Sequence, residues 1–91
     1  MLRLISTASN ATSEETQEWD TLEVYVSGGY TICAFYKLGK ALFEVQYLGE
    51  RFGCASYDVF EGDVIPSVEE ALDRIILWNA GEDQFLKEWL G

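Results

Sequence analysis

Residues Leu22–Leu48, LEVYVSGGYTICAFYKLGKALFEVQYL, decide the fold. Two short turns, Gly28–Gly29 and Leu38–Gly39, divide this stretch into three runs rich in β-branched and aromatic residues. Such runs are typical of β-strands, and turns this short join neighbouring antiparallel strands. The stretch therefore predicts an antiparallel β-meander, to which residues 52–57 add a fourth strand after a further turn at residues 49–51.

The register of the first hairpin determines which side chains share a face of the sheet. Leu22, Val24 and Val26 alternate with polar or aromatic residues. A two-residue turn would place these three side chains on the face opposite the most apolar positions of the next two strands. A three-residue loop, residues 27–29, pairs Val26 with Tyr30 and aligns all of the apolar positions. We therefore expect a bulged hairpin with the three-residue loop.

With that register, a helix is expected to cover one face, formed by Leu22, Val24, Val26, Ile32, Ala34, Phe43 and Val45. The opposite face is mixed, and its expected members are Glu23, Tyr25, Thr31, Cys33, Phe35, Leu42, Glu44 and Gln46. Apolar Phe35 and Leu42 beside Tyr25, with Glu23 and Glu44 around them, make this second face a candidate partner-binding surface. Cys33 and Cys54 are expected on opposite faces as free thiols, which excludes a disulfide between them.

The segments around the meander predict an α+β domain. Residues 1–6 suggest a short edge strand, and residues 6–20 an acidic polar loop or one irregular helical turn, with Trp19 anchored in the core. Ser67 and Glu70 match a helix-capping pattern, apolar residues then recur at helical spacing, and Gly81 suggests an end before a second helix at residues 82–90. We expect a single domain, residues 1–91, with a sheet of three to five strands at residues 21–58 and one or two helices at residues 67–90.

The charge balance bears on the kind of partner. The chain has 16 acidic residues, 6 basic residues and no His, for a net charge of −10. Phosphates repel such a surface, so direct binding of nucleic acid is not expected, whereas a basic protein partner is favoured. Without His, a Ser–His or Cys–His catalytic pair cannot be built, so we expect no enzyme. The carboxylates of residues 58–63 do not match a calcium loop, and no metal or cofactor is expected.

No apolar run approaches the length of a membrane span, and the first residues are too short for a secretory signal. A cytoplasmic protein that does not bind membranes is therefore expected. A homodimer is compatible with the sequence.

Acidic clusters provide the candidate binding residues. Glu69, Glu70 and Asp73 are expected on the exposed side of the first helix, and Glu82 and Asp83 extend this set. Acidic residues in a first helical turn also stabilise the helix dipole, by ~0.3–1 kcal/mol each, which is a purely structural explanation. However, Glu69 and Asp73 are like charges four residues apart, which the fold alone does not require. They could present spaced negative charge, as DNA does, to a groove that binds phosphates.

A short first strand, the meander at residues 22–47 with its Gly28–Gly29 hairpin, and the amphipathic helix at residues 67–78 resemble the small acidic anti-CRISPR proteins of phages. The resemblance is one of architecture and composition, with no diagnostic motif. It implies a non-enzymatic inhibitor in the host bacterial cytoplasm that binds a Cas protein or surveillance complex and blocks DNA binding or nuclease recruitment. Two alternatives remain open: an adaptor or oligomerisation module that uses the mixed sheet face, and an immunity or antitoxin protein for a basic nuclease.

Overall fold

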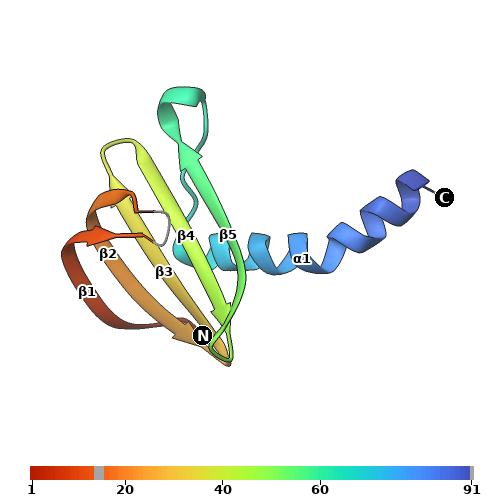
Figure 1. The fold of residues 1–91 in the computed structure, drawn as a ribbon, viewed down its shortest axis with the longest axis horizontal. Helices are drawn as coiled ribbons and strands as arrows, with labels where there is room; N and C mark the ends of the chain where they lie inside the picture. Colours follow the sequence, from red (N-terminus) through yellow and green to blue (C-terminus); the bar gives the residue numbers. More distant parts are fainter. Residues whose placement is uncertain (14–15, 91) are drawn as a thin grey trace.

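The computed structural model describes residues 1–13 and 16–90, and the side chains of residues 1–13 and 16–80. Its elements are β1 (Arg3–Thr12), β2 (Glu18–Ser27), β3 (Tyr30–Lys37), β4 (Lys40–Tyr47), β5 (Glu50–Asp58), the short 3-10 helix η1 (Val59–Glu61) and α1 (Val68–Leu90). The strands form one antiparallel sheet in chain order, and α1 packs on one of its faces (Figure 1). The predicted α+β meander is confirmed.

The N-terminal segment differs from its prediction. Residues 6–20, expected as a loop, belong mostly to β1 and β2, which pair from Arg3↔Val26 to Thr12↔Glu18. β1 is one of the two edge strands, and almost all of its side chains are exposed. A strand exposed on both faces needs no apolar alternation, so its Ser- and Thr-rich sequence is indistinguishable from a polar loop by pattern alone.

The register of the first hairpin is also different from the prediction. Ser27 pairs with Tyr30, so the turn has two residues, and Gly28 takes a left-handed φ of +55°. The predicted three-residue loop is therefore wrong. Leu22, Val24 and Val26 lie opposite Phe35, Cys33 and Thr31, on the face away from α1. The prediction failed because it assumed that only one face of the sheet is covered, whereas both are.

The helix face, as we call the side of the sheet under α1, carries the main core. Its buried cluster comprises Ile32, Ala34, Ala41, Phe43, Val45 and Ala55 from the sheet, with Ala71, Leu72 and Ile75 from α1. Four of the seven side chains predicted for this face are therefore confirmed. α1 lies close to β5 at Gly53, where an added Cβ would lie 2.9 Å from Ile75 Cγ2.

The opposite side, which we call the hairpin face, carries a smaller cluster. Trp19, Phe35 and Leu42 are buried there, with Ala11, Leu22 and Cys33 packed against them. The Trp19 and Phe35 ring centroids are 6.1 Å apart. Since Ala11 and Trp19 are paired in β1 and β2, the end of this hairpin covers the face. The expectation that Trp19 belongs to the core is confirmed.

The start of α1 agrees with the sequence, and its end does not. Ser67 Oγ accepts a hydrogen bond from the Glu70 backbone N–H at 3.2 Å, as expected of a capping residue. The helix then continues to Leu90 as one element rather than ending at Gly81. An interior glycine costs a helix only ~1 kcal/mol relative to alanine, which its neighbours can offset. Within the described part of the chain, no helix combines the length and apolarity of a membrane span.

Candidate protein-interaction surface

The acidic residues of α1 lie where the sequence places them. Glu69, Glu70 and Asp73 are all exposed at the start of the helix. Arg74 approaches Glu70 with an N–O distance of 3.9 Å, one helical turn along. Glu69 and Asp73, four residues apart on the helix, therefore form a pair of exposed like charges. The side chains of Glu82 and Asp83 lie outside those that the structure describes.

The five sheet residues predicted as one surface are divided between the two faces. Glu23 and Tyr25 pair with Ala34 and Ile32, so they lie on the helix face, whereas Glu44 lies on the hairpin face. The Tyr25 hydroxyl donates a hydrogen bond of 3.0 Å to Glu23 Oε1. Burial, and then this bond and the carboxylate charge, raise the pKa of Tyr25. The predicted mixed cluster of these residues is wrong because it depended on the three-residue loop.

Phe35 and Leu42 do remain together on one face, but they are not available to a partner. They pair directly across β3 and β4 and are only 4% and 8% exposed, since Trp19 packs over them. The expectation that these two side chains are exposed on the sheet is therefore wrong. An adaptor that binds its partner through exposed Phe35 and Leu42 is therefore not supported by this arrangement.

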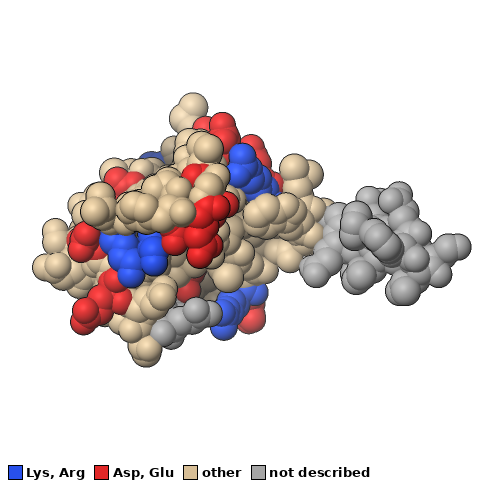
Figure 2. Space-filling model, turned by 90° about the horizontal axis from the view of Figure 1, so that it is seen from above, with Lys and Arg blue, Asp and Glu red and all other residues tan. Residues whose placement is uncertain are grey.

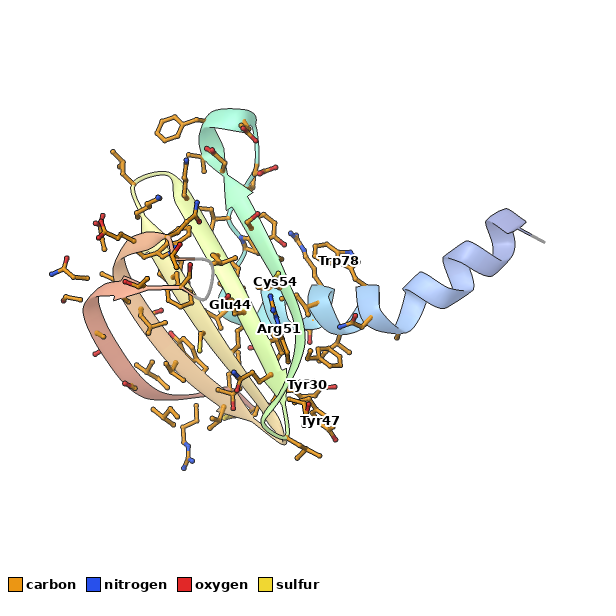
Figure 3. The ribbon with its side chains drawn as sticks, in the orientation of Figure 1. Tyr30, Glu44, Tyr47, Arg51, Cys54 and Trp78 are labelled. Carbon is orange, nitrogen blue, oxygen red and sulfur yellow. The ribbon has the colours of Figure 1, made fainter. Side chains whose placement is uncertain are left out.

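The cysteines also share a face, contrary to expectation. Cys33 and Cys54 lie on either side of Glu44, on β3 and β5. With a strand between them, their Cα atoms are separated by about 10 Å, beyond the reach of a disulfide. Within the described residues neither cysteine forms a disulfide, as expected. They line a cavity of ≈ 210 Å³ with Glu44 and Arg51. Figure 3 labels Glu44, Arg51 and Cys54, which come from β4 and β5.

A second exposed feature escaped the sequence analysis. We call it the apex: the β3–β4 turn, Leu38–Gly39, together with residues 59–63 after β5, at the upper end of the sheet in Figure 1. The Val59 N–H donates to the Gly39 carbonyl at 2.9 Å and joins the two segments. The Phe60 ring lies directly over Gly39, where any Cβ would collide with it. Gly39 has φ +72°, so both its conformation and this contact favour glycine.

The carboxylates of the apex hold its own turn. Asp58 Oδ1 accepts the Phe60 N–H at 2.8 Å, and Asp63 Oδ2 accepts the Asp58 N–H at 2.9 Å. Lys40 Nζ lies 3.8 Å from Asp58 Oδ2. In the described part of the chain, no group of three or more His, Cys, Asp or Glu side chains is placed to hold a metal ion. These hydrogen bonds give the acidic loop a structural role and fix the position of Phe60.

The apex therefore combines exposed apolar side chains with a hydrogen-bonded acidic turn. Phe60 is 72% exposed and Leu38 is 85% exposed. Figure 2 views this end of the molecule and shows Asp and Glu side chains on several sides of a small basic group. The local bases are Lys40, beside Asp58, and Lys37, whose Nζ lies 4.8 Å from the centre of the Trp19 ring. Exposed Glu61 and Asp63 leave the rim of the apex acidic.

The only sequence signal for the apex is the pattern of turn-forming residues after β5. Asp58, two residues before Phe60, and Gly62, with φ +97°, form a self-capped turn around an apolar residue. Such a turn protrudes from the end of a strand, so its apolar residue is left in water. Comparison with known proteins adds nothing to these observations, since no family model, curated protein or solved structure matches the chain.

Proposed function

We propose that this protein inhibits a basic, nucleic-acid-handling protein by binding to it, without catalysis. The observation that carries the proposal is the exposed pair Glu69 and Asp73 at the start of α1. Like charges at this spacing cost the helix a few tenths of a kcal/mol, so folding does not explain their presence together. A partner that binds phosphates would gain from such a pair.

The overall charge supports the same kind of partner. With a net charge of −10, the chain is attracted to a basic groove over a distance of about one Debye length, ~8 Å at physiological salt. Attraction of this kind increases the association rate more than the final affinity. A Cas protein or surveillance complex, which the architectural resemblance implies, has a groove of this type.

The proposal is tested by capture of the partner from a bacterial lysate, with the double variant Glu69→Lys/Asp73→Lys compared with the unchanged protein. We expect the variant to retain its fold and to lose the partner and the inhibition. Glu50→Lys is the control for charge reversal at another site, since Glu50 is an exposed acidic residue at the start of β5. Retention of inhibition by the double variant would reject this surface.

Salt dependence provides an independent measurement on the captured pair. If acidic side chains make the contact, affinity should fall steeply between low and physiological salt. An affinity that is constant across this range would contradict the proposal, because apolar contacts respond little to screening.

A further inference from the structure

We infer that the apex is a hydrophobic anchor, with Phe60 and Leu38 entering an apolar pocket that has a basic rim on a protein partner. This inference rests on the proposed function only in requiring a basic partner; it concerns a different surface from Glu69 and Asp73. Its starting observation is that two of the most exposed large apolar side chains of the described chain lie at one end of the sheet, on segments that the hydrogen bond from Val59 N–H to the Gly39 carbonyl joins.

Pre-organisation is the first argument. Exposed Phe60 is held by the Asp58 cap, by the hydrogen bond of 2.9 Å from Val59 N–H to Gly39, and by its contact with Gly39. A side chain that is already held in place loses little conformational freedom on binding, and that saving increases affinity. Aromatic side chains in such positions commonly supply most of the binding energy of an interface.

Charge decides what kind of surface fits over the anchor. Glu61 and Asp63 are exposed beside Phe60, whereas Lys40 is drawn to Asp58 and Lys37 to Trp19. A second copy of the apex would bring these carboxylates together, so self-association through this end is disfavoured. A pocket rimmed by Lys or Arg complements both the apolar centre and the acidic rim.

The opposite end of the sheet lacks this combination, although it also exposes apolar side chains. There the Tyr30 and Tyr47 rings, labelled in Figure 3, pack against each other with centroids 4.7 Å apart and planes tilted by 45°, and Tyr30 also packs edge-on against Phe52. Leu48, at the β4–β5 turn, is as exposed as Phe60, at 72%. The charged residues that follow it in the sequence are one acidic and one basic, Glu50 and Arg51. This end therefore provides a control without an acidic rim.

A defined probe makes the inference testable before the partner is identified. The probe is an amphipathic peptide of Lys and Leu, titrated into isotope-labelled protein at physiological salt, with an oligolysine of equal charge as the comparison. We expect amide shifts to concentrate at residues 38–40 and 59–64 with the Lys/Leu peptide and to be much weaker with oligolysine. Phe60→Ala should weaken binding by about tenfold or more, as hot-spot residues do, and Phe60→Leu should restore most of it.

Leu48→Ala is the matched control, since it removes an equally exposed apolar side chain from the other end, and it should leave binding unchanged. The variant Glu69→Lys/Asp73→Lys should still bind the peptide at the apex, which separates failure of the proposed function from failure of this inference. Equal binding by Phe60→Ala, equal apex shifts with oligolysine, or concentration-dependent apex shifts without peptide would each overturn the hydrophobic anchor for a basic partner.

Discussion

The two faces of the sheet are both covered, but by different kinds of structure. On the helix face, α1 contributes Ala71, Leu72 and Ile75 to a core built around Phe43. On the hairpin face, a single large side chain, Trp19, covers Phe35 and Leu42, and it comes from the sheet itself. The difference shows how a small domain can bury a second apolar surface without a second layer. It also explains why the hairpin face offers no binding surface at Phe35 and Leu42.

The largest effect is expected from the helix face. Phe43 is completely buried, and Phe43→Ala should destabilise the fold by ~3–5 kcal/mol, through lost burial and the cavity left behind. Because small domains have only ~5–15 kcal/mol of stability, this loss should leave the variant close to unfolding. Urea denaturation followed by circular dichroism measures it. Phe60→Ala is the matched control, and it should change the free energy of unfolding by no more than ~0.5 kcal/mol.

Removal of Trp19 tests whether the hairpin face is a real second core. Trp19→Ala should cost about 3 kcal/mol, near the lower end for a buried aromatic residue, because few side chains pack around it. The indole Nε1 has no hydrogen-bond partner in the part of the chain described, so no hydrogen bond is lost. Exposure of Phe35 and Leu42 should also increase binding of an apolar dye. Trp78→Ala, which removes a half-exposed indole from α1, should have neither effect; similar losses from both variants would show that Trp19 is not a core residue.

The same two faces show what could be predicted from sequence. The turns at Gly28–Gly29 and Leu38–Gly39 and the cap at Ser67 are local signals, because a few neighbouring residues determine each conformation, and all three are found in the structure. Register is not local. Because both faces carry apolar side chains, Leu22 fits either one, and in the structure it packs against the cluster of Trp19, Phe35 and Leu42. Trp19 comes three residues before Leu22, so strict alternation along the strand would place the two side chains on opposite faces. In the structure they share the hairpin face.

The candidate surfaces divide in the same way. The exposure of Glu69, Glu70 and Asp73 follows from the periodicity of one helix, and it is confirmed. At the apex, the turn around Phe60 has a local sequence signal, but its contact with Gly39 could not be derived, since the two residues are 21 positions apart in the sequence and meet across two strands. No pattern within either segment predicts that contact. Grouping of side chains from different elements therefore needed the three-dimensional structure, whereas exposure within one helix did not.

A smaller effect is expected where α1 meets β5. Gly53 lies on the helix face, and a methyl group there would come within 2.9 Å of Ile75 Cγ2 and 3.0 Å of Asn79 Nδ2. Ile75 is buried and has little room to move, so Gly53→Ala should cost ~1–3 kcal/mol through overpacking. It should also weaken the hydrogen bond of 2.9 Å that Asn79 Nδ2 donates to the Phe52 carbonyl. Ser56→Ala, at an exposed position of the same strand, is the control, and equal stability of the two variants would show that this close approach is not a constraint.

The smallest expected effect concerns the rim of the helix face, where Glu23 lies near two tyrosines. Burial, and then the charge of Glu23, raise the pKa of Tyr36 from 10.0 to about 12. Between pH 10 and 12 the unfolded chain loses the Tyr36 proton while the folded chain keeps it. The contribution of Tyr36 to the free energy of unfolding should therefore be fully present below pH 10 and fall as the pH rises towards 12. Glu23→Gln should lower the midpoint of Tyr36, followed by its ring resonances, but only in part, because burial is the larger cause. Glu50→Gln, at the start of β5 and at the other end of the sheet from Tyr36, should leave the midpoint unchanged. An unchanged midpoint in Glu23→Gln would instead assign the whole shift to burial.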